Sequence, residues 1–261
     1  MIQAEPPSGA VAPLPLLPTV SEAYRLVFGN LATMAKVTVL PFVLLFLITV
    51  LGTLLGPLEY RLVREFGAEL PWTLMAVAWL RFLLLGPTSG DVVVFPRLRA
   101  RHGRFLGYAL LLSVINLPLT FFHYLSVALG IDGTEATIAY WALFMPLLYL
   151  GLRFAFVYVA AAVDEPYSFA HAWRHTRGIS FTLFIAIGLS VVLPAEGINR
   201  LLALLTDSLR DSDSGTFVAL LLWHANMWLV EALSLAFYVI AFRNCTGWVP
   251  APDKEVLERF D

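Results

Sequence analysis

The chain has 261 residues, of which 59% belong to the apolar and aromatic class AVILMFWYC and only 14% are charged. Soluble proteins contain roughly 45–50% and about 25% of these classes, so this chain has too few charged side chains to cover a soluble domain. The net charge of −2 excludes nucleic acid as a default partner, because there is no broad basic face to neutralise phosphates. The composition predicts an all-α bundle of helices embedded in a membrane.

The N-terminal segment divides into a tail and an amphipathic helix. Residues 1–18 are rich in proline and are expected to form a disordered tail. Thr19 and Glu22 stand three residues apart, the spacing of a capping box, and predict that a helix starts here. Apolar side chains recur at helical spacing over residues 19–34, so we expect this helix to lie in the membrane interface.

Six later segments each carry the roughly 20 apolar residues that a helix needs to cross a bilayer core. The second is interrupted by Gly86-Pro87-Thr88-Ser89-Gly90, which predicts a kink with Thr88 and Asp91 recapping the second half. Residues 19–245 are therefore expected to form one transmembrane domain, followed by a tail over 246–261. The predicted spans are 36–57, 71–95, 105–129, 137–163, 179–204 and 217–243.

Positive charges are distributed unevenly between the two ends of the predicted spans. Because Lys and Arg gather in cytoplasmic loops, their bias predicts that both termini are cytoplasmic. The basic side holds Arg25, Lys36, Arg97, Arg99, Arg101, Arg104, Arg174, Arg177, Arg243, Lys254 and Arg259, and the opposite side holds Arg61, Arg64, Arg200 and Arg210 among acidic residues.

A weak repeat supports an arrangement of three helical hairpins. Ala23-Tyr24-Arg25 with Gly29 before the first span matches Ala172-Trp173-Arg174 with Gly178 before the fifth, and Arg99 to Gly103 is a degenerate copy. The repeat predicts that a basic amphipathic segment precedes each hairpin; chance recurrence of short apolar patterns is the alternative. The arginines expected to contact lipid headgroups are Arg25, Arg99, Arg101, Arg174 and Arg177.

Several polar side chains fall near the middle of the predicted spans. Ionisable groups at that depth are costly and must face the interior of the bundle. They are expected to form a buried polar cluster, which would be either a pocket for an anionic or zwitterionic ligand or a ligand-free strut between helices. The expected members are Arg81, Arg153, Glu231, His224 and Asn226, with Asn116 and His123 as further candidates.

Other chemical motifs are weak. His171 and His175 have the i, i+4 spacing of metal ligands on a helix, but no further ligand is near them. The single Cys245 allows neither an intramolecular disulfide nor a cysteine-based metal site. With no nucleotide-binding loop or nucleophile elbow in the sequence, we expect no cofactor, no metal and no enzymatic activity.

The region around the fifth span resembles a known group. Arg153, Asp164-Glu165 and residues 168–178 (SFAHAWRHTRG) form a pattern similar to that of poorly characterised bacterial six-helix membrane protein families. These include the membrane domain fused to some glycerophosphodiester phosphodiesterases. The resemblance implies an integral domain of the bacterial inner membrane. It does not imply phosphodiesterase activity, because the catalytic domain of those fusions has no counterpart here.

Two functions remain open from the sequence. The first is a non-enzymatic binding or accessory role at the lipid interface or in envelope homeostasis, with membrane lipids and a membrane protein as the partners considered. The alternative is a transporter or channel-like protein with a polar mid-membrane pathway. A cavity that reaches mid-membrane and exposes Arg153 would favour transport, whereas a fully paired Arg153 in a dry bundle would count against it.

Overall fold

The computed structural model describes residues 14–52, 63, 66–87, 97–131, 133–208 and 213–250. The regular elements in these ranges are all helices, which confirms the predicted all-α class. In chain order they are α1 (Leu16–Phe28), α2 (Leu31–Gly52), α4 (Glu69–Leu85), α5 (Ala100–Ser113), η2 (Val114–Asn116), α6 (Leu117–Ala128), α7 (Gly133–Ala162), α8 (Phe169–Thr176), α9 (Ser180–Ile187), η3 (Gly188–Val192), α10 (Leu193–Ser208) and α11 (Asp213–Thr246).

Five helical stretches of the described residues are long and apolar enough to cross a membrane, which indicates a multi-pass membrane protein. The second predicted span is not among them. Its helix α4 is 17 residues long, shorter than the roughly 20 that a bilayer core requires. The predicted recapping at Thr88 and Asp91 lies outside the described residues. The five stretches are Leu31–Leu51, Ala100–Phe122, Gly133–Ala162, Ser180–Leu205 and Phe217–Thr246.

Helix α1 starts earlier than the sequence indicated. It begins at Leu16 with Pro15 as its N-cap residue, because proline is tolerated in a first helical turn, where backbone N–H groups have no helical acceptor. Thr19 is not the cap: its hydroxyl donates to the Pro15 carbonyl at 2.7 Å. The predicted helix start at Thr19 is therefore wrong, and α1 also ends at Phe28, before the predicted limit. Its buried side chains pack against α11 and α9.

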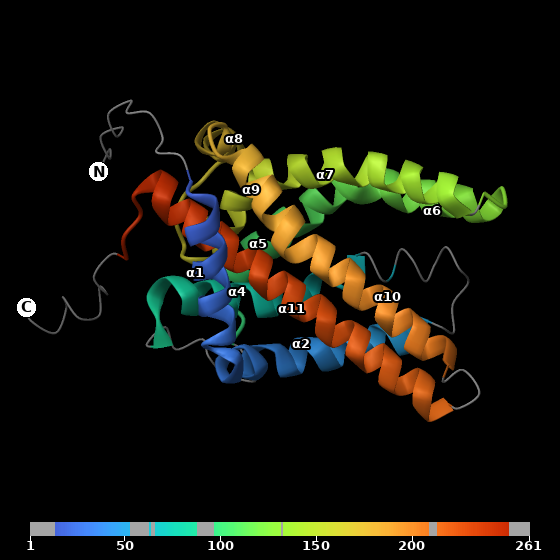
Figure 1. The fold of residues 1–261 in the computed structure, drawn as a ribbon. Helices are drawn as coiled ribbons and strands as arrows, with labels where there is room; N and C mark the ends of the chain where they lie inside the picture. Colours follow the sequence, from blue (N-terminus) through green and yellow to red (C-terminus); the bar gives the residue numbers. More distant parts are fainter. Residues whose placement is uncertain are drawn as a thin grey trace, which may run out of the picture.

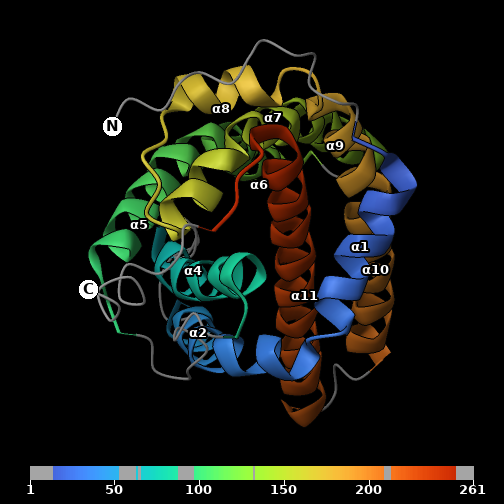
Figure 2. The ribbon, with the colours of Figure 1, turned by 90° about the vertical axis from the view of Figure 1, so that its left-hand side faces the viewer.

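Helix α4 forms the centre of the bundle. Its residues 75–80 are at most 3% exposed, and it packs against α2, α5, α7 and α11. Figure 2 shows α4 enclosed between α2, α5 and α11. A helix that is apolar on every side belongs in such an interior position. Small residues on the neighbouring helices, among them Ala155, Ala160, Ala232 and Ala236, allow this close approach.

The fifth predicted span is continuous but irregular, because the π-helical turn η3 separates α9 from α10. Pro194 follows this turn and has no N–H to give to the carbonyl of Ser190, four residues earlier. The Tyr24 hydroxyl of α1 donates to that carbonyl instead. The irregular turn thus provides the attachment point for α1.

Packing is uneven along the bundle. Helix α7 buries side chains throughout its C-terminal part, from Leu152 to Ala162, whereas none of its residues 133–151 is buried. In Figure 1, α6 and the N-terminal part of α7 lie side by side and project away from α2, α10 and α11. We call residues 117–151 the α6–α7 arm. At the opposite end of the long helices, α1 and α8 gather with the C-terminal end of α11 (Figure 1).

Candidate functional site

The charged cluster expected at mid-membrane does not form among the described residues. Arg81 donates through Nη1 to the carbonyl of Ala162, the last residue of α7, at 3.0 Å. Arg153 donates through Nη2 to the carbonyl of Trp173, in the last turn of α8, at 2.5 Å. Both arginines therefore donate to carbonyl groups in the last turn of a helix, where carbonyls lack a backbone N–H partner four residues on. Glu231 instead accepts a hydrogen bond from Trp72, so the two arginines lie apart from it.

Two features of the fold explain this difference. Helix α4 ends at Leu85, so Arg81 lies in its last turns and not at the centre of a long span. Helix α8 packs against α7 and covers Arg153, which is only 4% exposed. The guanidinium of Arg153 lies 4.0 Å from the centroid of the Trp173 ring, a cation–π contact. Its Nη1 also lies 3.3 Å from the Ser180 hydroxyl.

The other expected members of the cluster divide between two places. Asn226 turns toward α10, where its amide donates to the Asn199 side chain at 2.9 Å. His224 turns toward α2, with Nε2 3.1 Å from the Thr49 hydroxyl. Its Nδ1 lies 2.9 Å from the Leu220 carbonyl and must be the donor there, because a carbonyl only accepts. The structure thus separates Asn226 from His224 and Glu231, which share one cavity.

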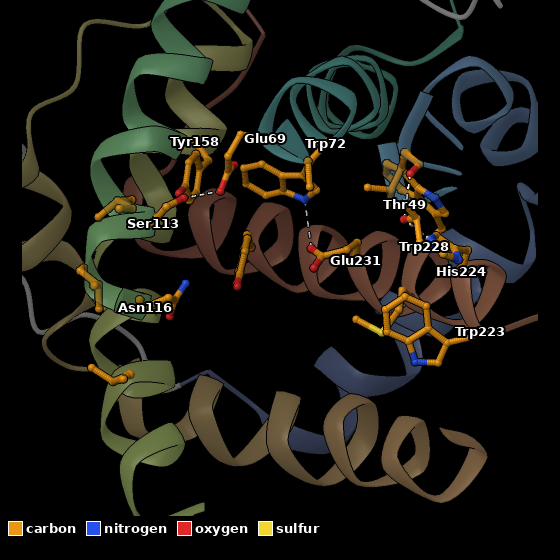
Figure 3. Close-up of a pocket in the computed structure, with 18 residues that line it drawn as sticks. Thr49, Glu69, Trp72, Ser113, Asn116, Tyr158, Trp223, His224, Trp228 and Glu231 are labelled. Atoms are coloured by element: carbon orange, nitrogen blue, oxygen red, sulfur yellow. Dashed lines mark hydrogen bonds between the residues drawn. The ribbon is translucent and has the colours of Figure 1, made fainter. Parts of the chain in front are cut away.

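This cavity has a volume of about 410 Å³ and lies between α2, α4, α5, η2, α7 and α11. Its size is typical of a site for a small ligand. Figure 3 shows polar side chains from these helices around it, with Glu69 and Glu231 on either side of Trp72. The polar and aromatic lining residues are Thr49, Glu69, Trp72, Ser113, Asn116, Tyr158, Trp223, His224, Trp228, Glu231 and Tyr238.

The two carboxylates of the cavity are held by different helices. Glu231 Oε2 accepts a hydrogen bond from Trp72 Nε1 at 3.1 Å, which joins α11 to α4. The Trp72 indole is in turn packed against Tyr158, with ring centroids 5.1 Å apart. Glu69 accepts from the Ser113 hydroxyl. Glu69 stands in the first turn of α4, where the positive end of the helix dipole stabilises a carboxylate.

The predicted headgroup contacts lie mostly on one exposed surface. Arg25, Arg99, Arg174 and Arg177 are exposed and belong to, or directly flank, α1, α5 and α8. Figure 2, which looks onto that end of the molecule, shows these three helices around its periphery. Arg101 is the exception: it is 8% exposed and pairs with Asp164 at 3.1 Å. We call this surface, formed by the four exposed arginines, the basic end; it comprises Arg25, Arg99, Arg174 and Arg177.

Asp164 lies two residues after the end of α7 in a left-handed conformation, with φ +63°. Such a conformation is unfavourable for most residues and is best tolerated by Gly, Asn and Asp. Arg101 and Arg104 of α5 both pair with its carboxylate. A strained backbone position is thus maintained by ion pairs from α5 to the turn after α7, which explains why Arg101 is withdrawn from the surface.

The two histidines of α8 are engaged in local contacts. His171 Nδ1 lies 3.0 Å from the Ser168 hydroxyl, and His175 Nδ1 lies 2.6 Å from the Tyr167 hydroxyl. Burial raises the pKa of Tyr167, so its hydroxyl stays protonated and can donate to a neutral His175. Burial, with nearby His171 and Arg174, lowers the pKa of His175 below its ordinary value. Among the described residues, no group of three or more metal-ligating side chains is present.

Acidification is expected to loosen the docking of α8. An unfolded histidine titrates near 6.5 and the folded His175 titrates lower, so the folded state resists protonation. Its contribution to stability is complete above about pH 6.5 and is lost as the pH falls through the lowered value. The unfolding temperature measured from about pH 8 to about pH 5 should therefore fall less steeply for His175→Gln than for wild type. Identical slopes would contradict this assignment.

Comparison with known proteins adds no relative: no protein-family model, curated protein or solved structure matches the chain. The function must therefore be argued from geometry. Sequence reasoning found Glu231 and His224 but missed Glu69, Trp72 and Tyr158 as their neighbours. The available signal was that Glu69 stands at the start of the apolar run of α4.

Proposed function

We propose that the chain is a non-enzymatic protein of the bacterial cytoplasmic membrane that binds lipids at its basic end, in a binding or accessory role related to the envelope. In this proposal six helices cross the membrane as three hairpins, α4 supplies the second crossing, and both termini are cytoplasmic. The relation to the membrane domain of glycerophosphodiester phosphodiesterases is part of the same proposal.

The observation that supports it is the position of four exposed arginines at one end of the long helices. Arg174 and Arg177 lie at the end of α8, an eight-residue helix that buries Ala172 and Thr176 and exposes its basic face. Trp173, 44% exposed, lies beside them. Arginines next to an exposed indole suit the boundary between acyl chains and anionic phosphate groups.

The double variant Arg174→Ala/Arg177→Ala is expected to bind anionic phospholipid about ten-fold or more weakly than wild type. Juxtamembrane basic residues contribute about 1 kcal/mol each toward an anionic surface, so removing two should weaken retention by roughly an order of magnitude or more. Native mass spectrometry of protein taken from nanodiscs of mixed phosphatidylglycerol and phosphatidylethanolamine measures this directly.

Arg200→Ala is the matched control. Arg200 is exposed but pairs with Glu196 on α10, away from the basic end, and its loss should leave lipid retention unchanged. Equal lipid retention in the double variant and wild type would contradict the proposed role. An equal loss in Arg200→Ala would show a diffuse charge effect and would also contradict it.

A transporter or channel-like function is the second candidate, and the cavity favours it. Glu231 and His224 line a space between six helical elements, as a polar intramembrane pathway would require. Arg153 does not contribute, because it is buried against α8 and α9 outside this lining. A pathway through this cavity would therefore be lined by Glu69 and Glu231 and not by Arg81 or Arg153.

A further inference from the structure

The cavity between α4, α7 and α11 contains two phenol groups that can bind a ligand. Tyr158 of α7 and Tyr238 of α11 line it, and neither hydroxyl has a hydrogen-bond partner among the described residues. Tyr158 packs against Trp72 and Phe105, with ring centroids 5.1 and 5.0 Å apart, so its ring is held in place. The two tyrosines lie within electrostatic range of one another and of Glu231. Their hydroxyls therefore offer hydrogen bonds close to a carboxylate.

A third donor belongs to Trp228, which also lines the cavity. This residue is 4% exposed, and its Nε1–H has no acceptor among the described residues. Leaving a buried donor unpaired is unfavourable, so such a group in a native structure indicates a missing partner. Figure 3 shows Trp228 beside His224 at one end of the cavity, and Tyr158 beside Ser113 at the other. The donors are thus distributed along the cavity.

Glu231 supplies an acceptor to the same space. Its Oε2 accepts from Trp72 Nε1 at 3.1 Å, and a carboxylate can accept about four hydrogen bonds in total. It therefore has capacity for a further donor. A hydroxyl group on a ligand could accept from a tyrosine and donate to Glu231 at once, whereas an ether or carbonyl oxygen could only accept. This combination of groups favours an alcohol.

The rest of the lining indicates that the alcohol is uncharged and elongated. No described lining residue is Lys or Arg, so an anionic headgroup would meet no such side chain. Both ring nitrogens of His224 already have partners, the Leu220 carbonyl and the Thr49 hydroxyl. His224 and Tyr238 of α11 both line the cavity and stand roughly 21 Å apart along the helix axis. The aliphatic lining residues include Leu45, Leu112, Ile115, Leu147 and Met227.

From these features we propose that the cavity binds an uncharged, long-chain alcohol, whose hydroxyl accepts from Tyr158 or Tyr238 and donates to Glu231. The volume of about 410 Å³ lies within the range of sites for small ligands. Such sites are mostly apolar with a few polar groups that fix orientation, as here. This inference concerns a different part of the molecule from the basic end and does not depend on the lipid role proposed there.

The test uses dodecanol that carries a photoreactive diazirine in its chain, with the full chain in nanodiscs of phosphatidylcholine, a lipid without a hydroxyl group. After irradiation, mass spectrometry should find the label on the segments of α4, α7 and α11 that line the cavity. Unlabelled dodecanol should compete about three- to ten-fold better than dodecane, because only the alcohol forms hydrogen bonds. The methyl ether 1-methoxydodecane accepts but cannot donate, so it should fall between them.

Tyr158→Phe/Tyr238→Phe removes two hydroxyl groups and keeps both rings, so the advantage of dodecanol over dodecane should fall several-fold. Tyr108→Phe is the matched control: Tyr108 packs against Phe169 outside the lining, and its loss of a hydroxyl should leave the advantage unchanged. An unchanged advantage in the double variant would overturn the proposal. If that variant unfolds, the wild-type series decides, since equal competition by dodecanol and dodecane, or labelling confined to the α6–α7 arm, would also overturn it.

The source of the hydroxyl can be distinguished in the same nanodiscs. Stronger competition by monododecanoylglycerol than by dodecanol would identify the free hydroxyls of a glycerolipid, and weaker or equal competition a simple long-chain alcohol; both results support the site. Dodecyl phosphate competing as well as dodecanol would contradict the uncharged ligand. Arg174→Ala/Arg177→Ala should keep the preference for dodecanol, so failure of the lipid role and failure of this inference give different results.

Discussion

Replacing Arg153 with alanine is expected to destabilise the protein by ~3 kcal/mol or more, because the hydrogen bonds and the ring contact of a buried charged side chain would be lost. The side chain donates to the Trp173 carbonyl at 2.5 Å and lies against the Trp173 ring. It thereby attaches α8 to α7. Thermal unfolding in detergent, followed by size-exclusion chromatography, should show a large fall in the unfolding temperature.

Arg153→Lys tests whether the stabilisation requires only the positive charge of the side chain or also the planar shape of the guanidinium group. Lysine keeps the positive charge but cannot stack a planar group on an indole while donating in two directions. We expect most of the loss to persist in this variant. Full stability of Arg153→Lys would show that charge alone is required, and full stability of Arg153→Ala would contradict the structural role altogether.

Truncation of Trp79 to alanine is expected to be comparably damaging, at about 3 kcal/mol or more for a fully buried tryptophan. Trp79 is 0% exposed at the centre of α4. Its Nε1 donates to the Ala232 carbonyl of α11 at 3.1 Å, and its ring stacks on Phe82. Since lipid is as apolar as the core, the loss comes chiefly from van der Waals contacts and an unfilled cavity. The same unfolding assay measures it.

Trp79→Phe provides the internal comparison. It keeps an aromatic ring against Phe82 but removes the Nε1–H, so the Ala232 carbonyl loses its additional donor. The expected loss is about 1 kcal/mol. Equal unfolding temperatures for Trp79→Ala and wild type would mean that α4 is not the packing centre of the bundle.

The long apolar helices could be predicted because lipid selects them by length and composition. The fourth span, predicted over 137–163, is part of α7 (Gly133–Ala162), and the sixth, predicted over 217–243, is part of α11 (Asp213–Thr246). The length of the second helix was harder to predict, because the apolar residues of the sequence continue beyond Gly86. In the structure α4 ends before Gly86, which has a φ of +79°. A glycine followed by a proline indicated a break, but not that the helix stops there.

The candidate site could be predicted only in part. Glu231 was identified because a carboxylate in an apolar helix must face inward, which depends on local sequence alone. Its partners depend on tertiary packing: α8 covers Arg153, and α4 brings Trp72 to Glu231. Distance from a span end therefore could not show that Arg81 and Arg153 donate to carbonyl groups of other helices. Glu69 lies just before the second predicted span, which starts at residue 71, so the sequence did not place it in the helix.

The uneven packing of α7 has a mechanical consequence. Opening the α6–α7 arm separates few buried apolar surfaces, so its local free energy cost is small compared with that of opening the base around α4. The arm meets the base at η2 and near Pro146, two points where regular helical hydrogen bonding is interrupted. Ile115 and Asn116 from the first, with Leu147 and Gly151 from the second, line the cavity. The junction between the arm and the base is therefore a wall of the cavity. We expect a change in the angle of the arm to alter ligand affinity at the cavity, and a bound ligand to alter that angle in return.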